Sequence, residues 1–288
     1  MYDRFNREIT YLRISVTDRC NLRCTYCMPS CGIDLKSHHD LLSFEEITEI
    51  ARVAVGLGIR KIRLTGGEPL VRRGIVELVR QLAAVDGLET LAMTTNGILL
   101  PRYAEDLRAA GLQAVNISLD TLDPERYRET TRGGRVEDAV AGVDAAIAAG
   151  FHPIKINVVV ADTEAPGTAQ AAGAQADVPT GAVGAPGAGA LADLQAFCHE
   201  RGIILQKIGL YHLDRNKVDY EAFDRPPKCD NCNRLRLTSD GKFKPCLHSN
   251  HEFPVDFADI EEAILAAVAA KPFRGTACTN RSMVSIGG

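Results

Sequence analysis

Three cysteines lie within one short stretch near the start of the chain, at Cys20, Cys24 and Cys27. A [4Fe–4S] cluster has four irons, so three thiolates leave one iron open to an outside ligand. The amine and carboxylate of S-adenosylmethionine (SAM) form such a ligand, and the spacing therefore predicts a cluster that binds SAM. The alternative is a zinc site completed by Cys31 or His38, although zinc more often uses paired C-x-x-C elements.

The composition is that of a globular protein with a sizeable core, because 45% of the 288 residues are hydrophobic and 24% are charged. The net charge of −4 provides no broad basic field, so neither nucleic acid nor an anionic membrane is an expected partner. No stretch approaches the roughly 18 apolar residues of a membrane span. We expect a cytoplasmic protein, in which nine cysteines indicate metal ligation or catalysis rather than disulfides.

The first two thirds of the chain alternates β-rich runs with helical patterns, which is typical of a parallel α/β fold. The predicted strands cover residues 11–16, 61–65, 89–94, 114–119, 154–160 and 203–208. The predicted helices cover residues 43–57, 74–84, 101–110, 135–149 and 191–201. Right-handed crossovers coil such strands into a partial (β/α)6 barrel, whose active site lies at the carboxyl ends of the strands.

Residues 161–190 interrupt this alternation of strands and helices. They are mainly Ala, Gly, Pro, Thr, Gln and Asp, with no aromatic residue, and offer too little apolar surface to offset the entropy of ordering. We expect a flexible insertion there, within a barrel domain formed by residues 1–209. The pattern becomes irregular afterwards, which predicts a small C-terminal iron–sulfur module over residues 210–288.

A second group of three cysteines occurs in that module, at Cys229, Cys232 and Cys246. The sequence between them alternates polar and apolar residues like a half-buried strand, which would point Arg234 and Arg236 to one side. Two guanidinium groups beside a metal centre suit an anionic ligand. Zinc is a stronger alternative here than at the first group. Its fourth ligand would be one of His248, His251 and Cys278.

Polar residues follow the predicted strands at the same end of the barrel. Gly66 and Gly67 can expose backbone donors and allow close approach, and Glu68 offers a carboxylate for a ligand ammonium. Thr94 and Ser118 end the next two strands, where they can bind a ribose and a carboxylate or serve only as capping residues.

Seven motifs in this order resemble the GTP 3',8-cyclase family of radical SAM enzymes. They read VTDRCNLRCTYCMP, IRLTGGEPLVRR, TTNGILL, NISLDTL, KINVVV, CDNCNRLRLTSDGKFKPCL and a terminal IGG. The resemblance implies a radical SAM partial barrel with two [4Fe–4S] clusters and SAM. It also implies the family's reaction, which converts GTP to (8S)-3',8-cyclo-7,8-dihydroguanosine 5'-triphosphate in molybdenum cofactor biosynthesis.

The resemblance also assigns roles to individual residues. The first cluster would be held by Cys20, Cys24 and Cys27, and the second by Cys229, Cys232 and Cys246. The positions matching SAM contacts are Tyr26, Gly66, Gly67, Glu68, Thr94 and Ser118. The basic positions matching the GTP pocket are Arg13, Lys61, Arg63, Lys155, Arg234 and Arg236. The tail residues Gly287 and Gly288 would thread into the active site.

By the same resemblance, the radical formed from SAM removes hydrogen from the ribose C3' of GTP, and the resulting carbon radical closes on C8 of guanine. Such a reaction implies a one-electron donor of the flavodoxin or ferredoxin type. It also implies a downstream cyclic pyranopterin monophosphate synthase. Members of the family are frequently dimeric, which predicts a homodimer.

Two departures from the family affect the substrate more than the radical chemistry. The segment before the second cysteine group is short, and the sixth strand has Gln206 and Lys207 where the family has an arginine and a glutamate. One contact is therefore missing or replaced, with Lys207 as the candidate replacement. Alternatives are another purine nucleotide, a peptide substrate, and a non-catalytic paralogue with structural metal sites.

Overall fold

The structure is a computed structural model that describes residues 1–29, 31–160, 188–210, 212–218, 223–224 and 228–287. Most of the predicted insertion, residues 161–187, lies outside the described residues. Its last three residues belong instead to helix α6 (Ala188–Glu200), which begins three residues before the predicted helix start.

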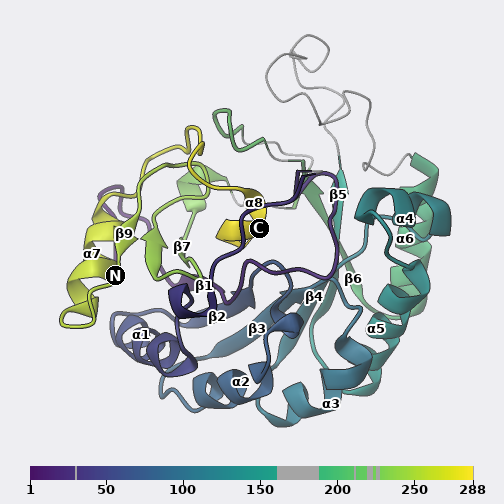
Figure 1. The fold of residues 1–288 in the computed structure, drawn as a ribbon, viewed down its shortest axis with the longest axis horizontal. Helices are drawn as coiled ribbons and strands as arrows, with labels where there is room; N and C mark the ends of the chain where they lie inside the picture. Colours follow the sequence, from purple (N-terminus) through teal and green to yellow (C-terminus); the bar gives the residue numbers. More distant parts are fainter. Residues whose placement is uncertain (30, 161–187, 211, 219–222, 225–227, 288) are drawn as a thin grey trace.

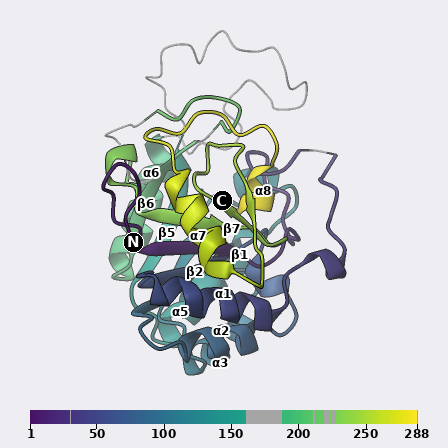
Figure 2. The ribbon, with the colours of Figure 1, turned by 90° about the vertical axis from the view of Figure 1, so that its left-hand side faces the viewer.

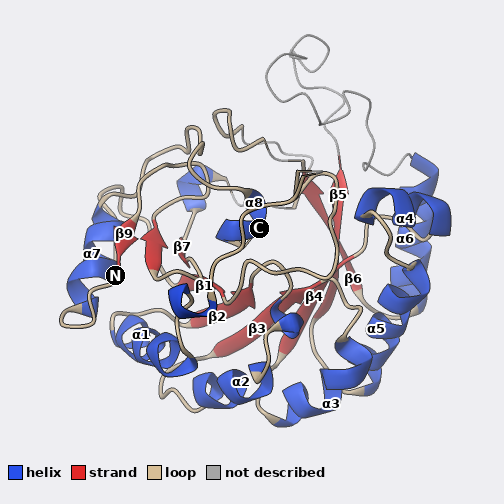
Figure 3. Cartoon of the chain, viewed as in Figure 1, coloured by secondary structure: helices blue, strands red, loops and turns tan. Residues whose placement is uncertain are grey.

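Six parallel strands form the centre of the fold. They are β1 (Tyr11–Ser15), β2 (Lys61–Thr65), β3 (Thr90–Thr95), β4 (Ala114–Ser118), β5 (Ile154–Val160) and β6 (Ile204–Gly209). Each strand pairs with the next in the chain, and the sheet curves so that the helices lie on its outer side (Figures 1 and 3). The predicted α/β partial barrel is confirmed, with strand ends that differ from prediction by one residue or coincide with it.

The outer layer contains α1 (Phe44–Gly56), α2 (Ile75–Ala83), α3 (Leu100–Ala109), α4 (Pro124–Thr131), α5 (Val136–Ala148) and α6. The capping box expected at α1 is present, because Ser43 Oγ accepts from the backbone N–H of Glu46 and the Glu46 carboxylate accepts from that of Ser43. Fully buried Leu12 and Ile14 of β1 join Ile47 and Ile50 of α1 in the core. Helix α4 is an addition to the predicted elements.

The C-terminal residues continue the barrel sheet beyond β1. Strand β7 (Arg234–Leu237) pairs parallel with β1. Strands β8 (Lys242–Lys244) and β9 (Phe253–Pro254) then follow in antiparallel pairing. Helix α7 (Ile260–Ala269) lies outside this part of the sheet, whereas the short α8 (Met283–Ile286) and the C-terminus lie inside its curve (Figures 1 and 2). Only the strand β7 among these elements was predicted, over residues 233–238.

Short 3-10 helices complete the described secondary structure, at His38–Asp40, Pro69–Val71 and Cys229–Asn231. Across the described ranges, no helix combines the length and apolar character that a bilayer crossing requires.

Candidate active site

The first cysteine group lies in a loop that begins just beyond β1, and Cys20, Cys24 and Cys27 are each half-buried. Burial and the neighbouring Cys20 sulfur raise the pKa of the Cys27 thiol to about 12. Burial and the charges of Cys27, Asp120 and Cys20 likewise raise the pKa of Cys24. Cys24 and Cys27 therefore lie close enough to Cys20 for its charge to raise the pKa of both. Positive iron would stabilise their thiolate forms, so this donor set fits a metal cluster.

The two glycines after β2 hold their loop against the stem of the cysteine loop. A Cβ on Gly66 would lie 2.7 Å from the carbonyl oxygen of Thr17, and one on Gly67 would lie 2.3 Å from that of Arg19. The amide of Gly67 donates to the Thr17 carbonyl at 2.8 Å. As expected, these glycines allow another group to approach closely. That group is the backbone of the cysteine loop rather than a ligand.

Glu68 is 1% exposed and is hydrogen-bonded within the protein. Its carboxylate accepts from the hydroxyl of Thr95 at 2.7 Å, from the amide of Asn96 at 2.7 Å and from the amide of Leu70 at 3.0 Å. Burial raises the pKa of Glu68 to about 7, although these three hydrogen bonds act against the rise. The carboxylate expected to face a ligand thus also joins the ends of β2 and β3.

Tyr26 ties the cysteine loop to the end of β4, because its hydroxyl donates to Oδ2 of Asp120 at 2.8 Å. Oδ1 of Asp120 accepts from the amide of Val159 on β5 at 2.8 Å. Thr94 and Ser118 are half-buried near the ends of β3 and β4. The residues expected to contact SAM therefore surround the carboxyl ends of the first four strands.

Five cationic side chains and one tyrosine form two adjacent rows across three strands. The first row is Lys61 on β2, Tyr11 on β1 and Arg234 on β7, and the second is Arg63, Arg13 and Arg236 on the same strands. The three arginines of the second row are at least nine-tenths buried. Burial, and after it the charges of Arg13 and Arg234, lower the pKa of Arg236 to about 9. Such crowding of like charge favours a bound anion.

Tyr11 occupies the centre of these rows and was not predicted as a site residue. Its hydroxyl accepts from Nε of Arg63 at 2.9 Å, and Lys61 Nζ and Arg234 Cζ lie 5.5 and 5.4 Å from its ring centroid. Burial alone would raise the pKa of Tyr11, but Arg63, Arg13, Arg234 and Lys61 together lower it to about 6. The available sequence signal was the two-residue spacing from Arg13, which puts both side chains on one face of β1.

The second row extends across the barrel through neutral side chains. Arg63 donates to the side-chain oxygen of Asn116 at 2.9 Å. The side-chain amide of Asn116 then donates to Asn157 at 3.0 Å and to Gln206 at 3.3 Å. Lys155 is aligned with Asn116 on the neighbouring strand.

The strand register places Lys207, the candidate replacement for the family contact on the sixth strand, away from this polar row. It is aligned with Val158, whose side chain is buried in the core. Gln206 instead aligns with Asn157 and contacts Asn116. Because successive strand residues face opposite sides, Gln206 is the residue of β6 that meets this polar row.

The C-terminal tail reaches all three strands that carry the cationic rows. The carbonyl of Gly287 accepts from Arg13 at 3.2 Å, from Arg236 at 3.1 Å and from the hydroxyl of Thr65 at 3.3 Å. Gly287 has a φ of +76°, and a Cβ there would lie 2.2 Å from the Thr65 hydroxyl oxygen. Gly288, also expected in the site, lies outside the described residues.

The second cysteine group lies among lysines. Lys217 donates to the Cys229 sulfur at 3.3 Å, and the fully buried Lys271 donates to the backbone carbonyls of Arg234 and Pro245. Burial alone would raise the pKa of Cys232, but the charges of Lys271 and Arg234 lower it overall. In contrast, burial raises the pKa of Cys246. These cations favour thiolates, as metal ligation requires.

Within the described ranges, no three His, Cys, Asp or Glu side chains converge as a single metal ion such as zinc requires. Thiolates that bind separate irons of one cluster need not converge in this way.

Comparisons with known proteins show to which class of protein this fold and its cysteine loop belong. The profile described as the Radical SAM superfamily matches residues 14–170. The fold resembles the crystal structure of Streptococcus suis SuiB bound to S-adenosylmethionine, with a TM-score of 0.65 and 16% identity over 93% of this chain and 66% of that one. The anSMEcpe structure with bound AdoMet gives a TM-score of 0.55 and 16% identity over 85% of this chain and 74% of that one. Barrel and cysteine loop together define a radical SAM protein.

Relatives of higher sequence identity show which family of radical SAM proteins the chain belongs to. GTP 3',8-cyclase of Alkaliphilus oremlandii is 42% identical over an alignment that covers all of both chains. GTP 3',8-cyclase of Heliobacterium modesticaldum is 44% identical over 88% of this chain and 85% of its own. The chain belongs to the GTP 3',8-cyclase family. The first alignment extends over 322 positions against the 288 residues of this chain, so that relative contains segments that this chain lacks.

Proposed function

We propose that this chain converts GTP to (8S)-3',8-cyclo-7,8-dihydroguanosine 5'-triphosphate for molybdenum cofactor biosynthesis. The main support is the pair of cationic rows across β2, β1 and β7. Five cations on one face of a sheet form a site for a polyanion, and buried guanidinium groups suit phosphate oxygens. The relatives named GTP 3',8-cyclase support GTP as that polyanion.

The first cysteine loop fits a [4Fe–4S] cluster held by Cys20, Cys24 and Cys27. When bound, the cluster and SAM supply a carbon-centred radical that removes a hydrogen atom from the substrate. Tyr26 would lie beside SAM, held in place by its hydrogen bond to Asp120. Gly66, Gly67, Glu68, Thr94 and Ser118 complete the proposed SAM site.

The cationic residues would determine the product by positioning the nucleotide. Arg13, Arg63 and Arg236 offer forked donors to the phosphates, and Lys61, Arg234 and Lys155 add positive charge around them. A fixed triphosphate restricts where the ribose C3' and guanine C8 can lie. Holding these two carbons close together favours ring closure over competing reactions.

We assign a second [4Fe–4S] cluster to Cys229, Cys232 and Cys246. Arg234 and Arg236 lie in the segment between these ligands, so the nucleotide site and the second cluster would be neighbours. An open iron there would bind the guanine base, as the family resemblance implies. Lys217 and Lys271 would offset the negative charge of the thiolates.

The reaction implies partners outside the chain. A flavodoxin or ferredoxin would supply single electrons, and a cyclic pyranopterin monophosphate synthase would consume the product. A homodimer and a cytoplasmic location are further parts of the proposal. All nine cysteines are free thiols, which suits a reducing compartment.

The test is an anaerobic reaction of the reconstituted protein with dithionite, SAM and each nucleoside triphosphate in turn, followed by mass spectrometry. We expect 5'-deoxyadenosine and an isomer of GTP that carries the new C3'–C8 bond. Conversion of another purine nucleotide in place of GTP would overturn the substrate, and Gln206 on β6 would then be the first residue to examine. Absence of 5'-deoxyadenosine with every nucleotide would indicate a non-catalytic paralogue.

A further inference from the structure

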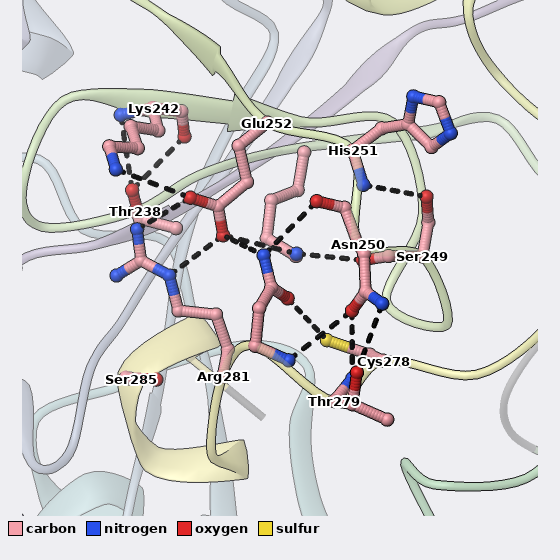
Figure 4. A network of polar contacts seen from close by, with 12 residues as sticks. Thr238, Lys242, Ser249, Asn250, His251, Glu252, Cys278, Thr279, Arg281 and Ser285 are labelled. Atoms are coloured by element: carbon pink, nitrogen blue, oxygen red, sulfur yellow. Dashed lines mark hydrogen bonds and ion pairs between the residues drawn. The ribbon is translucent and has the colours of Figure 1, made fainter.

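Arg281 lies six positions before Gly287 and is held between two carboxylates. Its Nη1 and Nη2 donate to the two oxygens of Asp240 at 3.1 and 2.9 Å, and its Nε and Nη2 donate to those of Glu252 at 2.7 and 2.8 Å. The three side chains are only 9 to 12% exposed. Figure 4 shows the Arg281 guanidinium facing Glu252 within this network.

The two carboxylates come from the loops of the C-terminal sheet. Asp240 lies in the turn between β7 and β8, and Glu252 immediately precedes β9. Although burial would raise the pKa of Glu252, the hydrogen bonds and charge of Arg281, assisted by Lys244, lower it to about 2. Hydrogen bonds from Arg281 likewise hold the pKa of Asp240 well below its usual range, against the effect of burial. Both carboxylates are therefore ionised at neutral pH.

The segment beside Arg281 is fixed by the same loops. The Asn250 side chain accepts from the amide of Thr279 at 2.7 Å and donates to its hydroxyl at 3.0 Å. The Asn280 side chain donates to the backbone carbonyl of Asn250 at 3.1 Å. Figure 4 shows Asn250 and Thr279 on the side of Arg281 that faces away from Ser285.

Beyond Arg281 the chain has little freedom before it reaches the cationic rows. Helix α8 follows directly, and its Val284 and Ile286 side chains are 1% exposed. Gly287 comes next, and its carbonyl accepts from Arg13 and Arg236. A shift of the tail at Arg281 would therefore also shift the acceptor that orients these two guanidinium groups.

We propose that Arg281 is a positioning residue for the nucleotide, because it anchors the tail through Asp240 and Glu252 and so sets the orientation of Arg13 and Arg236. The proposal rests on the function proposed above for those two arginines. Arg281 itself does not reach the cationic rows, so it acts through the tail. Its forked guanidinium forms paired hydrogen bonds with each carboxylate, and a lysine ammonium cannot reproduce this parallel geometry.

The test compares Arg281→Ala, Arg281→Lys and Asp240→Asn with the control Lys242→Met. Lys242 also pairs with Glu252, at 3.4 Å, but belongs to neither the tail nor the nucleotide site. Hydrogen–deuterium exchange over residues 282–287 is measured on the reconstituted holoenzyme, together with the KM for GTP and SAM cleavage without nucleotide.

Arg281→Ala should accelerate tail exchange and raise the KM for GTP by about tenfold or more, the effect of losing charge-assisted hydrogen bonds. Arg281→Lys and Asp240→Asn should give intermediate values, and SAM cleavage without nucleotide should stay near wild type in all variants. Lys242→Met should resemble the wild type throughout. A protected tail with unchanged KM in Arg281→Ala would overturn the proposal, as would equal effects in Lys242→Met.

Failure of this proposal and failure of the proposed function would give different experimental results. If the wild-type protein fails to convert GTP, the function is wrong, whereas tail exchange still reports whether Arg281 anchors the tail. Should Arg281→Ala fail to fold, Asp240→Asn provides the same test, because Arg281 keeps its contacts with Glu252 in that variant.

Discussion

The hydroxyl of Tyr26 and the carboxylate of Asp120 are hydrogen-bonded at 2.8 Å across 94 residues of sequence. The bond joins the first cysteine loop to the end of β4, and it lies part-buried at the point where SAM is proposed to bind. Tyr26 and Asp120 are therefore coupled parts of one site.

Replacing Tyr26 by Phe should leave the buried Asp120 with one donor fewer. The expected cost is about 1–3 kcal/mol of unfolding free energy, the usual penalty for an unsatisfied buried polar group. Denaturant unfolding of cluster-free protein measures it. Tyr103→Phe, on the outer helix α3, is the control. Equal stabilities of wild type and Tyr26→Phe would show that the hydrogen bond contributes nothing.

The Tyr11 phenol should be ionised near neutral pH in nucleotide-free protein. Its pKa in the folded state is about 6 and its ordinary value is 10.0, so the folded state favours the phenolate. This contribution to stability is complete above pH 10 and is lost as the pH falls toward 6. Over that window the stability difference between wild type and Tyr11→Phe should change by up to about 1.4 kcal/mol per pH unit.

Near-ultraviolet absorption of tyrosinate in cluster-free protein tests the Tyr11 prediction directly. A titration with a midpoint near pH 6 should appear in the wild type and vanish in Tyr11→Phe. The exposed Tyr2 provides the control, since Tyr2→Phe should retain that titration. A wild-type spectrum with tyrosinate only at strongly alkaline pH would contradict the prediction.

Gly287→Ala should displace the tail from the cationic rows. The new Cβ would overlap the Thr65 hydroxyl, and the left-handed φ adds about 1–2 kcal/mol of strain. Because Arg281 and the buried side chains of α8 leave the tail little freedom, we expect a higher KM for GTP together with a loss of unfolding free energy of about that size. Gly150→Ala is the matched control, since Gly150 has a φ of +73° but open space around its Cβ position. That variant should lose stability and keep its KM.

Cys24→Ser should remove the first cluster, because a serine hydroxyl replaces one of its three thiolates. Iron analysis of anaerobically reconstituted protein should show a loss of about half the iron, since two clusters are proposed. The exposed Cys31 provides the control, and Cys31→Ser should keep the full content. Equal iron in wild type and Cys24→Ser would exclude Cys24 as a ligand.

Metal analysis of the second site provides a further test. Cys246→Ser should lower the iron content and leave the SAM-responsive spectrum of the first cluster intact. The buried Cys198 of α6 is the control position. Zinc in place of iron in wild-type protein, lost on Cys246→Ser, would instead establish the zinc alternative for the second site.

Local patterns were sufficient to predict the barrel strands and the three-thiolate loops. Period-two alternation and apolar runs predict β1 to β6, because the burial of side chains in a covered parallel sheet leaves a recognisable pattern within each strand's own residues. The start of α6 was misplaced because residues 188–190 have the composition of the preceding insertion. Helix α7 has a local signal that the prediction did not use, because Asp259 caps its first turn by accepting from the amide of Glu262. Helix α8 has only four residues, too few to show a helical period.

By itself, the amino-acid sequence determined the parallel α/β class, the two groups of cysteines and the family to which they belong. Tertiary structure alone decided that β7 pairs with β1, which brings Arg13 beside Arg236 and surrounds Tyr11 with cations. It also decided that Gln206 rather than Lys207 meets the polar row, and that Arg281 anchors the tail. The physical reason is that a side chain's ionisation and partners depend on strand register and on contacts between residues far apart in the chain, which no local pattern specifies.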